Sequence, residues 1–235
     1  MSAALEIGSP AVVVGAQGGI GAACVEKLQL AGVQTVALDL PHADVTDRND
    51  IKATINSIGD ISILIYCSGV MIEDSALDPH GIDANFAVNF SGLVNVCSVV
   101  AKNMCVRKTG SIVVVSSNAG TTPRMGMASY GASKAAASAW ARTLALECAP
   151  FGVRCNVVSP GSTDTSMLRD MWPTGEDRTF DVISGNLGTY RLGIPLGKLA
   201  TAEDVANACV FLSSSAASHI TMHDLRVDGG ATFDK

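Results

Sequence analysis

Apolar runs and longer amphipathic stretches alternate along the whole chain. Runs such as Ala11–Gly15 (AVVVG) and Ser111–Ser116 (SIVVVS) are short, rich in valine and bounded by polar or glycine residues. Such runs suit strands buried on both faces of a sheet, whereas apolar residues that recur every three or four positions suit helices. The pattern predicts strands at Ala11–Gly15, Thr35–Leu38, Ile61–Tyr66, Ser111–Ser116, Val153–Val158 and Leu225–Val227, and helices at Ile20–Ala31, Ser91–Val106, Ala132–Cys148 and Ala202–Leu212. This alternation predicts a parallel sheet with right-handed crossovers.

Neither a repeat nor a linker interrupts this pattern, so we expect one domain over residues 1–235. The stretch at about 166–193 differs, because it is polar, contains Pro173, Gly175 and Gly185, and lacks a strong period. A long irregular excursion from a compact domain is usually functional. We therefore expect a substrate-covering segment here, and an inert surface excursion is the alternative.

A glycine-rich string follows the first predicted strand and opens the first predicted helix. Glycines in this context permit a tight turn and the close approach of a pyrophosphate to a helix N-terminus. The predicted cofactor contacts in this turn are Gly15, Gln17, Gly19, Ile20 and Gly21. Asp39 ends the second strand, where an acidic residue binds the ribose 2′-hydroxyl of NAD and repels the 2′-phosphate of NADP. The pattern therefore predicts NAD, and the alternative is that Asp39 is only a polar strand end.

The connection after Asp39 is unusually short. Only Leu40–Ala43 separate Asp39 from Asp44, and a parallel crossover needs about a dozen residues. The predicted fold is therefore a single-domain α/β Rossmann-type doubly wound parallel sheet whose third strand and preceding helix are truncated. Asp44 and Val45 remain candidates for contacts with adenine.

Tyr130 and Lys134 stand four residues apart on a predicted helix, so their side chains share one face. A free phenol titrates near pH 10 and is a poor base at neutral pH. A nearby ammonium stabilises the phenolate, and lowering the phenol pKa by two to three units requires about 3–4 kcal/mol. Ser117 follows a predicted strand and could donate a hydrogen bond to a substrate oxygen. This set predicts proton-transfer chemistry.

The combination of motifs resembles the short-chain dehydrogenase/reductase family over essentially the whole chain. The matching elements are Gly15-x-x-x-Gly19-x-Gly21, Asn89, Ser117, Tyr130-x-x-x-Lys134 and Pro160-Gly161. The resemblance implies that Tyr130 is the acid/base, Lys134 its electrostatic partner, Ser117 the group that polarises the substrate and Asn89 the anchor of a proton-relay water. It further implies cofactor contacts at Ser68, Gly69, Tyr130, Lys134, Pro160, Gly161, Thr163 and Thr165, and a homotetramer or homodimer.

A closer resemblance is to the branch of this family that oxidises 2,3-dihydro-2,3-dihydroxybenzoate in catechol siderophore biosynthesis. Thr122–Met127 (TPRMGM) and Ser162–Thr165 (STDT) carry it. It implies a small cyclic carboxylate substrate, and a carboxylate needs a cation. Arg124 is the main candidate because a guanidinium matches a carboxylate bidentately, and a surface or interface ion pair is the alternative for it. Arg191 is a weaker candidate. Met127 and Met167 are candidates for apolar walls, with ordinary core or interface positions as the alternative.

Charge and composition exclude other classes of function. The formal charge is −6 and no lysine or arginine cluster is present, so no nucleic-acid partner is expected. We expect no membrane span, no signal peptide in Met1–Pro10 and no metal site, although His219 and His223 lie four apart. Seven scattered cysteines without CxxC spacing predict free thiols in a reducing cytoplasm.

Three alternative functions remain open on the sequence. The first is a dehydrogenase of a related ring carboxylate, such as 2,3-dihydro-3-hydroxyanthranilate. The second is another short-chain alcohol dehydrogenase or carbonyl reductase, which Asp39 disfavours if the reductant is NADPH. The third is a cofactor-binding pseudoenzyme scaffold, which has no need of the Ser117, Tyr130 and Lys134 set.

Overall fold

The computed structural model describes residues 7–233, and one parallel sheet forms its centre. The strands follow the order β2-β1-β3-β4-β5-β6. Their bounds are β1 Ala11–Val14, β2 Thr35–Leu38, β3 Ile63–Tyr66, β4 Gly110–Val115, β5 Val153–Pro160 and β6 Asp224–Val227. Because β2 and β3 lie on opposite sides of β1, the strand order reverses there, which is where open α/β sheets bind ligands.

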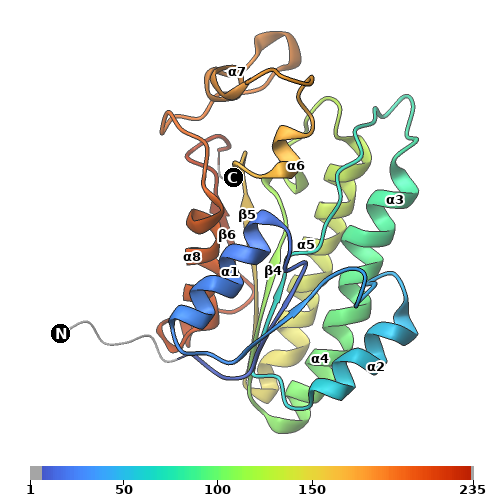
Figure 1. Ribbon diagram of the computed structural model, residues 1–235, viewed down its shortest axis with the longest axis vertical. Coiled ribbons are helices and arrows are strands. Elements are labelled where there is room, and N and C mark those ends of the chain that lie inside the picture. Colours follow the sequence, from blue (N-terminus) through green and yellow to red (C-terminus); the bar gives the residue numbers. More distant parts are fainter. Residues whose placement is uncertain (1–6, 234–235) are drawn as a thin grey trace, which may run out of the picture.

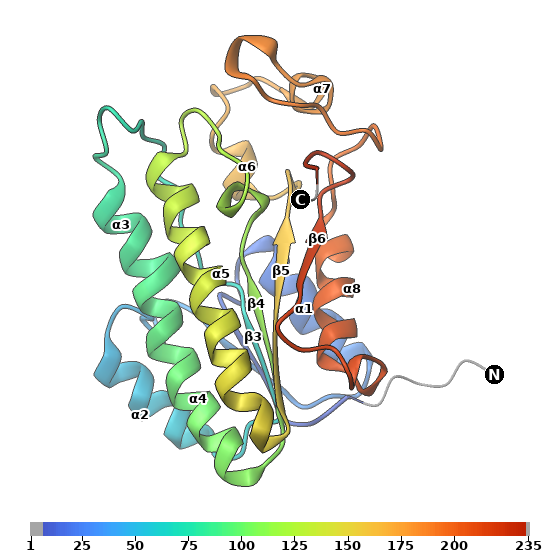
Figure 2. The same ribbon diagram turned by 180° about the vertical axis from the view of Figure 1, so that it is seen from behind.

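Helices cover both faces of the sheet. The bounds are α1 Gly19–Leu30, α2 Arg48–Ile58, α3 Ile82–Phe86, α4 Leu93–Arg107, α5 Ala128–Cys148, α6 Ser166–Arg169, α7 Thr179–Ser184 and α8 Ala202–Ser213. Figure 1 shows α1 and α8 on one face and α2, α4 and α5 on the other, and Figure 2 shows the same layers from behind. The predicted α/β fold with a parallel sheet is therefore confirmed.

Local sequence explains why the principal elements form. β1 is completely buried, and its four residues pair with β2 on one side and β3 on the other. Helix α8 begins at a capping box, in which the Thr201 side chain and Asp204 exchange hydrogen bonds with each other's backbone N–H. Helix α5 begins at Ala128, four residues before the predicted start, so both Tyr130 and Lys134 lie in its first turns.

The short connection after β2 leaves no room for the usual third strand and the helix before it, as predicted. The chain turns at Pro41–Ala43 and enters α2, whose Asp47 caps the backbone N–H groups of Asn49 and Asp50. It then returns to β3 on the other side of β1, so β2 is an edge strand among the described residues. The third strand of the usual fold and its preceding helix are thus missing from this part of the chain. Helix α2 itself was not predicted, because only Ile51, Ile55 and Ile58 mark its apolar side.

The expectation of no membrane span needs one correction, because one stretch does have the length and apolarity that a span requires. The continuous helical stretch Ile82–Arg107 is long and apolar enough to cross a membrane by length and composition, with a mean hydropathy of 1.4. In the structure this stretch packs on the sheet, and Leu93, Val96 and Val100 belong to the core. Core helices pass the same test, so this feature carries little weight for a membrane location. All seven cysteines are free thiols, as expected.

Candidate active site

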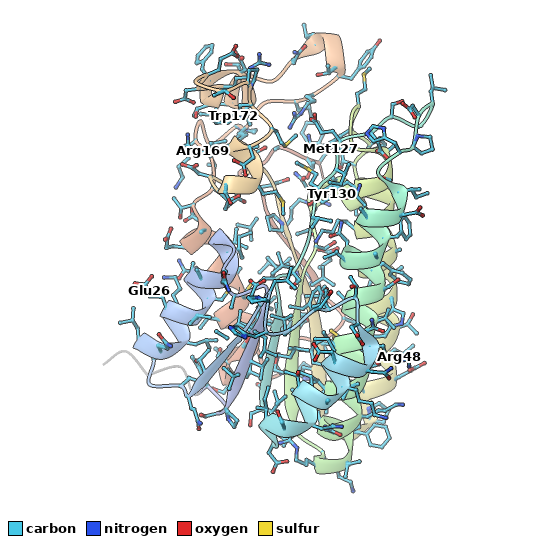
Figure 3. The ribbon with its side chains drawn as sticks, turned by 45° about the vertical axis from the view of Figure 1, so that its right-hand side comes forward. Glu26, Arg48, Met127, Tyr130, Arg169 and Trp172 are labelled. Atoms are coloured by element: carbon cyan, nitrogen blue, oxygen red, sulfur yellow. The ribbon has the colours of Figure 1, made fainter. Side chains whose placement is uncertain are left out.

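A cleft of about 370 Å³ lies at the carboxyl ends of the strands. Its walls come from the ends of β4 and β5, from α5, from the loop after β3 and from the segment between α6 and Arg191. Figure 3 shows Tyr130 and Met127 near the top of α5, with Arg169 and Trp172 of the α6 region on the other side. The irregular segment predicted to cover the substrate therefore forms one wall, and it contains two short α-helices, α6 and α7.

The turn after β1 is built for close backbone approach. Gly15 has a φ of +80°, and a Cβ there would meet the backbone N of Ser68 at 2.4 Å. A Cβ on Gly21 would meet the carbonyl oxygen of Gly15 at 2.0 Å. Side chains at these two positions would therefore fill the cradle at the N-terminus of α1. The N-terminal N–H groups of α1 have no side-chain cap, which leaves this helix end suited to a pyrophosphate.

Asp39 lies directly beside this turn. Its carboxylate accepts a hydrogen bond of 2.8 Å from the backbone N–H of Gln17, and the Gln17 side chain donates to the carbonyl oxygen of Leu40. The acidic group is thus held next to the glycine turn, where a ribose hydroxyl of a bound dinucleotide would lie. Glycine turn and carboxylate together fit NAD.

The loop after β5 reaches the other end of the same turn. Thr165 directly precedes α6, and its methyl group lies 2.7 Å from where a Cβ on Gly19 would stand. Thr163 is buried and donates to the carbonyl oxygen of Gly161. The end of β5 at Pro160 and the loop that begins at Gly161 therefore join the dinucleotide turn to the cleft.

Tyr130 is buried at the centre of the cleft wall. Burial raises the pKa of its phenol, while the Ser117 hydroxyl and the charge of Arg124 act in the opposite direction. Ser117 lies just beyond β4, and its hydroxyl accepts a hydrogen bond from the backbone N–H of Ala119. The predicted neighbours Tyr130 and Ser117 are therefore brought together in the cleft, within electrostatic reach of Arg124.

Lys134 lies one helical turn below Tyr130. Its ammonium lies 5.9 Å from the centre of the Tyr130 ring and donates to the carbonyl oxygen of Val115 at 3.2 Å. Burial lowers the pKa of this ammonium from 10.5 to about 8. The amine is therefore still largely protonated at neutral pH, and its positive charge favours the phenolate form of Tyr130.

Asn89 stands behind these residues in a short π-helical stretch, Ala87–Gly92. Its side chain accepts from the N–H of Val70, donates to the carbonyl of Val70 and donates to the Ser133 hydroxyl. The Asn89 amide thus connects the π-helical stretch to the loop after β3 and to α5. A π-helical turn at such a position is typical of functional sites.

Two arginines face the substrate side of the cleft. Burial, and then the positive charge of Arg191, lowers the pKa of Arg124. Burial also lowers the pKa of Arg191, while the carboxylate of Glu73 opposes this effect. The carboxylates of Asp228 and Glu73 act on Arg124 and Arg191 respectively, so they offset part of this positive charge. Two neighbouring guanidinium groups at one end of a cleft nevertheless suit an anion.

The structure brings most of the predicted site residues to the cleft. Those that line it are Ile20, Gly69, Ser117, Arg124, Met127, Tyr130, Lys134, Pro160, Gly161, Thr163, Thr165, Met167 and Arg191. The adjoining turn contains Gly15, Gln17, Gly19 and Gly21, and Asp39 and Ser68 lie against it.

Two predicted adenine contacts lie outside the cleft. Asp44 is exposed, and its carboxylate accepts from the backbone N–H and the hydroxyl of Thr46. The Val45 side chain is buried, and it lies 2.6 Å from where a Cβ on Gly92 would stand. Val45 therefore packs against the π-helical stretch.

Several cleft residues were not predicted. Met71 and Glu73 come from the loop after β3, and Trp172 and Arg178 come from the covering segment. Nothing in the local sequence marks Met71 or Glu73 as part of a site. The only available signal was the position of this loop after a buried strand, where parallel sheets place their ligands.

Comparison with known proteins agrees with this geometry. Residues 40–232 match the family model described as enoyl-(acyl carrier protein) reductase. The chain is 41% identical to 2,3-dihydro-2,3-dihydroxybenzoate dehydrogenase of Bacillus subtilis, with 96% of this chain and 97% of the relative covered. It is 36% identical to the vibriobactin-specific 2,3-dihydro-2,3-dihydroxybenzoate dehydrogenase of Vibrio cholerae, with 97% of each covered.

The fold also matches solved structures. The structure of ElxO with NADP bound superposes with a TM-score of 0.85 at 25% identity, covering 95% of this chain and 99% of that one. The chain belongs to the short-chain dehydrogenase/reductase family of oxidoreductases.

Proposed function

We propose that this protein oxidises 2,3-dihydro-2,3-dihydroxybenzoate to 2,3-dihydroxybenzoate with NAD, a step of catechol siderophore biosynthesis. The observation that carries the proposal is a single cleft that holds both Tyr130, with Ser117 and Lys134, and a pair of arginines. The first group suits removal of a hydroxyl proton, and the second suits a ring carboxylate. The names of the relatives that are 36% and 41% identical support the same substrate.

The chain's own residues would carry the proton chemistry. Tyr130, as phenolate, takes the proton of a ring hydroxyl, and the Ser117 hydroxyl donates to that oxygen and holds it in place. The charge of Lys134 stabilises the phenolate during the transfer, and Asn89 would anchor a water that returns the proton to solvent. NAD, when bound, supplies the acceptor for the hydride that leaves the same carbon. The ring ketone that results tautomerises to the aromatic catechol, which makes the oxidation strongly favourable.

The substrate end would recognise the carboxylate. Arg124 lies in the loop between Ser117 and Tyr130, so a carboxylate bound there lies close to the proton-transfer site. Arg191 would contribute a second positive charge from the covering segment, and Met127 and Met167 would contact the apolar part of the ring. Closing residues 166–193 over the ring would exclude water from the reacting atoms.

The cofactor end would select NAD over NADP. Asp39 is fixed by Gln17 beside the glycine turn, and a 2′-phosphate at this point would meet its negative charge. Gly15, Gly19, Ile20 and Gly21 would surround the pyrophosphate. Contacts to the nicotinamide half would come from Ser68, Gly69, Lys134, Pro160, Gly161, Thr163 and Thr165. Asp44 would lie toward the adenine.

The proposal also includes assembly and location. Apolar side chains are exposed on the outer helical layer, with Val106 at 83% and Leu146 at 65%, and these support a homotetramer or homodimer through α4 and α5. Seven free thiols support a reducing cytoplasm.

One assay tests the function. The purified protein with NAD and 2,3-dihydro-2,3-dihydroxybenzoate should produce NADH and a fluorescent catechol in equal amounts. Replacing NAD by NADP should reduce kcat/KM markedly. Turnover of 2,3-dihydro-3-hydroxyanthranilate without turnover of the dihydrodiol would contradict the proposed substrate and leave the dehydrogenase chemistry in place.

A further inference from the structure

A second buried asparagine repeats the contacts of Asn89 one helical turn earlier. Asn85 is 0% exposed, accepts from the N–H of Ile72 at 3.1 Å and donates to the carbonyl of Ile72 at 3.0 Å. It also donates to the Ser129 hydroxyl at 2.7 Å. Asn89 makes the corresponding three bonds to Val70 and Ser133. Ser129 and Ser133 each directly precede one of the two residues proposed to carry the chemistry, Tyr130 and Lys134.

Ser129 extends this set of contacts to a third loop residue. Its backbone N–H donates to a carboxylate oxygen of Asp74 at 3.0 Å, and the hydroxyl of Ser129 lowers the pKa of that carboxyl. Asp74 is buried, and its backbone N–H donates to the carbonyl of Gly126. The loop after β3 is thus held at Val70, Ile72 and Asp74, which are alternate residues.

The residues between these anchors line the cleft. Met71 and Glu73 alternate with the three held positions, and both belong to the cleft wall. In an extended chain, side chains two residues apart point to the same side. Glu73 also interacts electrostatically with Arg191 of the covering segment. The anchors therefore decide where Met71 and Glu73 stand relative to the substrate end.

We propose that Asn85, Ser129 and Asp74 form a buried polar network that positions the rim segment Val70–Asp74 and so sets Met71 and Glu73 against the bound substrate. Asn85 and Ser129 are positioning residues, because they act through the rim and touch neither substrate nor cofactor. This inference rests on the proposed function only for the identity of the substrate. Loss of one link should therefore affect substrate binding more than the chemical step.

The mildest test is Ser129→Ala, which removes the hydroxyl and keeps the backbone bond to Asp74. Ser111→Ala is a matched control, because Ser111 is equally buried, at 4% exposure, and bonds the carbonyl of Leu212 far from the cleft. We expect amide hydrogen exchange in residues 70–74 to be about tenfold faster in Ser129→Ala than in wild type, and unchanged in Ser111→Ala. We expect Ser129→Ala to raise KM for the dihydrodiol by about three- to tenfold, with kcat and the Kd of NADH within about twofold. Ser129→Thr, which keeps a hydroxyl, should restore KM.

Each outcome decides the inference. Unchanged exchange in residues 70–74 of Ser129→Ala would show that the network does not hold the rim. Faster exchange with unchanged KM would show that the rim does not serve the substrate, and equal KM changes in both alanine variants would show a general loss of stability. If the wild-type protein does not oxidise the dihydrodiol, the proposed function fails, while the exchange comparison still decides whether the network positions the rim.

Discussion

The two ends of the cleft differ in the groups that form them, which are mainly backbone at the cofactor end and side chains at the substrate end. At the cofactor end, the backbone forms most of the site. A Cβ at Gly15 or Gly21 would collide with neighbouring backbone atoms, and Asp39 is held by a backbone N–H. At the substrate end, the walls are side chains such as Arg124 and Arg191, carried on loops and on the covering segment. Phe180, Leu187 and Tyr190 of that segment are each at least 77% exposed.

This difference separates the binding of a widely shared ligand from the recognition of a substrate particular to this chain. A backbone cradle tolerates few substitutions, so it suits a ligand that many enzymes share. Side chains on loosely packed segments can change without disturbing the sheet, so they suit the recognition of one substrate. Tyr130 and Lys134 lie between the two ends, and both are buried residues of α5. Substitutions should therefore separate into effects on chemistry, on substrate and on cofactor.

The largest loss of activity is expected at Tyr130, where the cofactor end and the substrate end meet. Tyr130→Phe removes the hydroxyl that accepts the proton, and kcat should fall by about a hundred- to ten-thousandfold. The Kd of NADH, measured by fluorescence, should stay nearly unchanged because the glycine turn is intact. Tyr190→Phe, at an 88% exposed position, serves as the control and should retain full activity. Near-normal turnover by Tyr130→Phe would contradict the proposed proton transfer.

The next largest effect should be on KM for the substrate, with the cofactor end unaffected. Arg124→Ala removes a charged hydrogen-bond donor to the carboxylate and should raise KM by about tenfold to a hundredfold, with little change in kcat, because this contact is made in ground and transition states alike. Arg191→Ala should raise KM less, since Glu73 already faces that guanidinium. Arg48→Ala, on α2, is the control. A similar loss of NAD affinity in Arg124→Ala would remove the distinction between the two ends.

A smaller effect should be confined to the cofactor end. Asp39→Ser removes the negative charge beside the glycine turn, so the Kd of NAD should rise about tenfold and the preference over NADP should shrink. Titration calorimetry with both nucleotides measures this directly, and KM for the dihydrodiol should not change. Asp60→Ser is the control, because it removes an exposed carboxylate elsewhere and should leave the affinities for NAD and NADP unchanged. An unchanged nucleotide preference in Asp39→Ser would assign the selectivity to another residue.

The smallest effect concerns stability. Burial lowers the pKa of Lys134 to about 8 in the folded protein, against an ordinary value of 10.5. Between these two values the unfolded chain binds more protons than the folded one, so the free energy of unfolding rises with pH over this interval. The cost of the buried charge is thus full below about pH 8 and vanishes toward pH 10.5.

Lys134→Met removes that charge. Without cofactor, the variant should have a higher Tm than wild type at pH 7, by a few degrees, and the difference should shrink as the pH rises from about 8 to 10.5. Lys102→Met, at an exposed position on α4, is the control and should show no such pH dependence. A Tm difference that is constant with pH would contradict the destabilising role of the Lys134 charge.

The sequence predicts the sheet more completely than the site. Strands such as Ser111–Ser116 and β4, Gly110–Val115, agree within one residue, because burial on both faces requires a continuous apolar run. Tyr130, Lys134, Ser117 and Arg124 could be grouped because their spacing places them near one edge of the sheet. Met71 and Glu73 could not, since their position depends on contacts to Asn85 and Ser129, which are distant in sequence.

The shortened crossover after β2 has a consequence for how the protein behaves in concentrated solution. A terminal strand presents unpaired backbone groups that can recruit a strand from another molecule and start aggregation. Here the exposed border is only four residues long, Thr35–Leu38, and Pro41, which has no N–H to donate, follows it closely. A short border ended by proline offers little template for intermolecular pairing, so the chain can omit a strand without becoming prone to fibril formation.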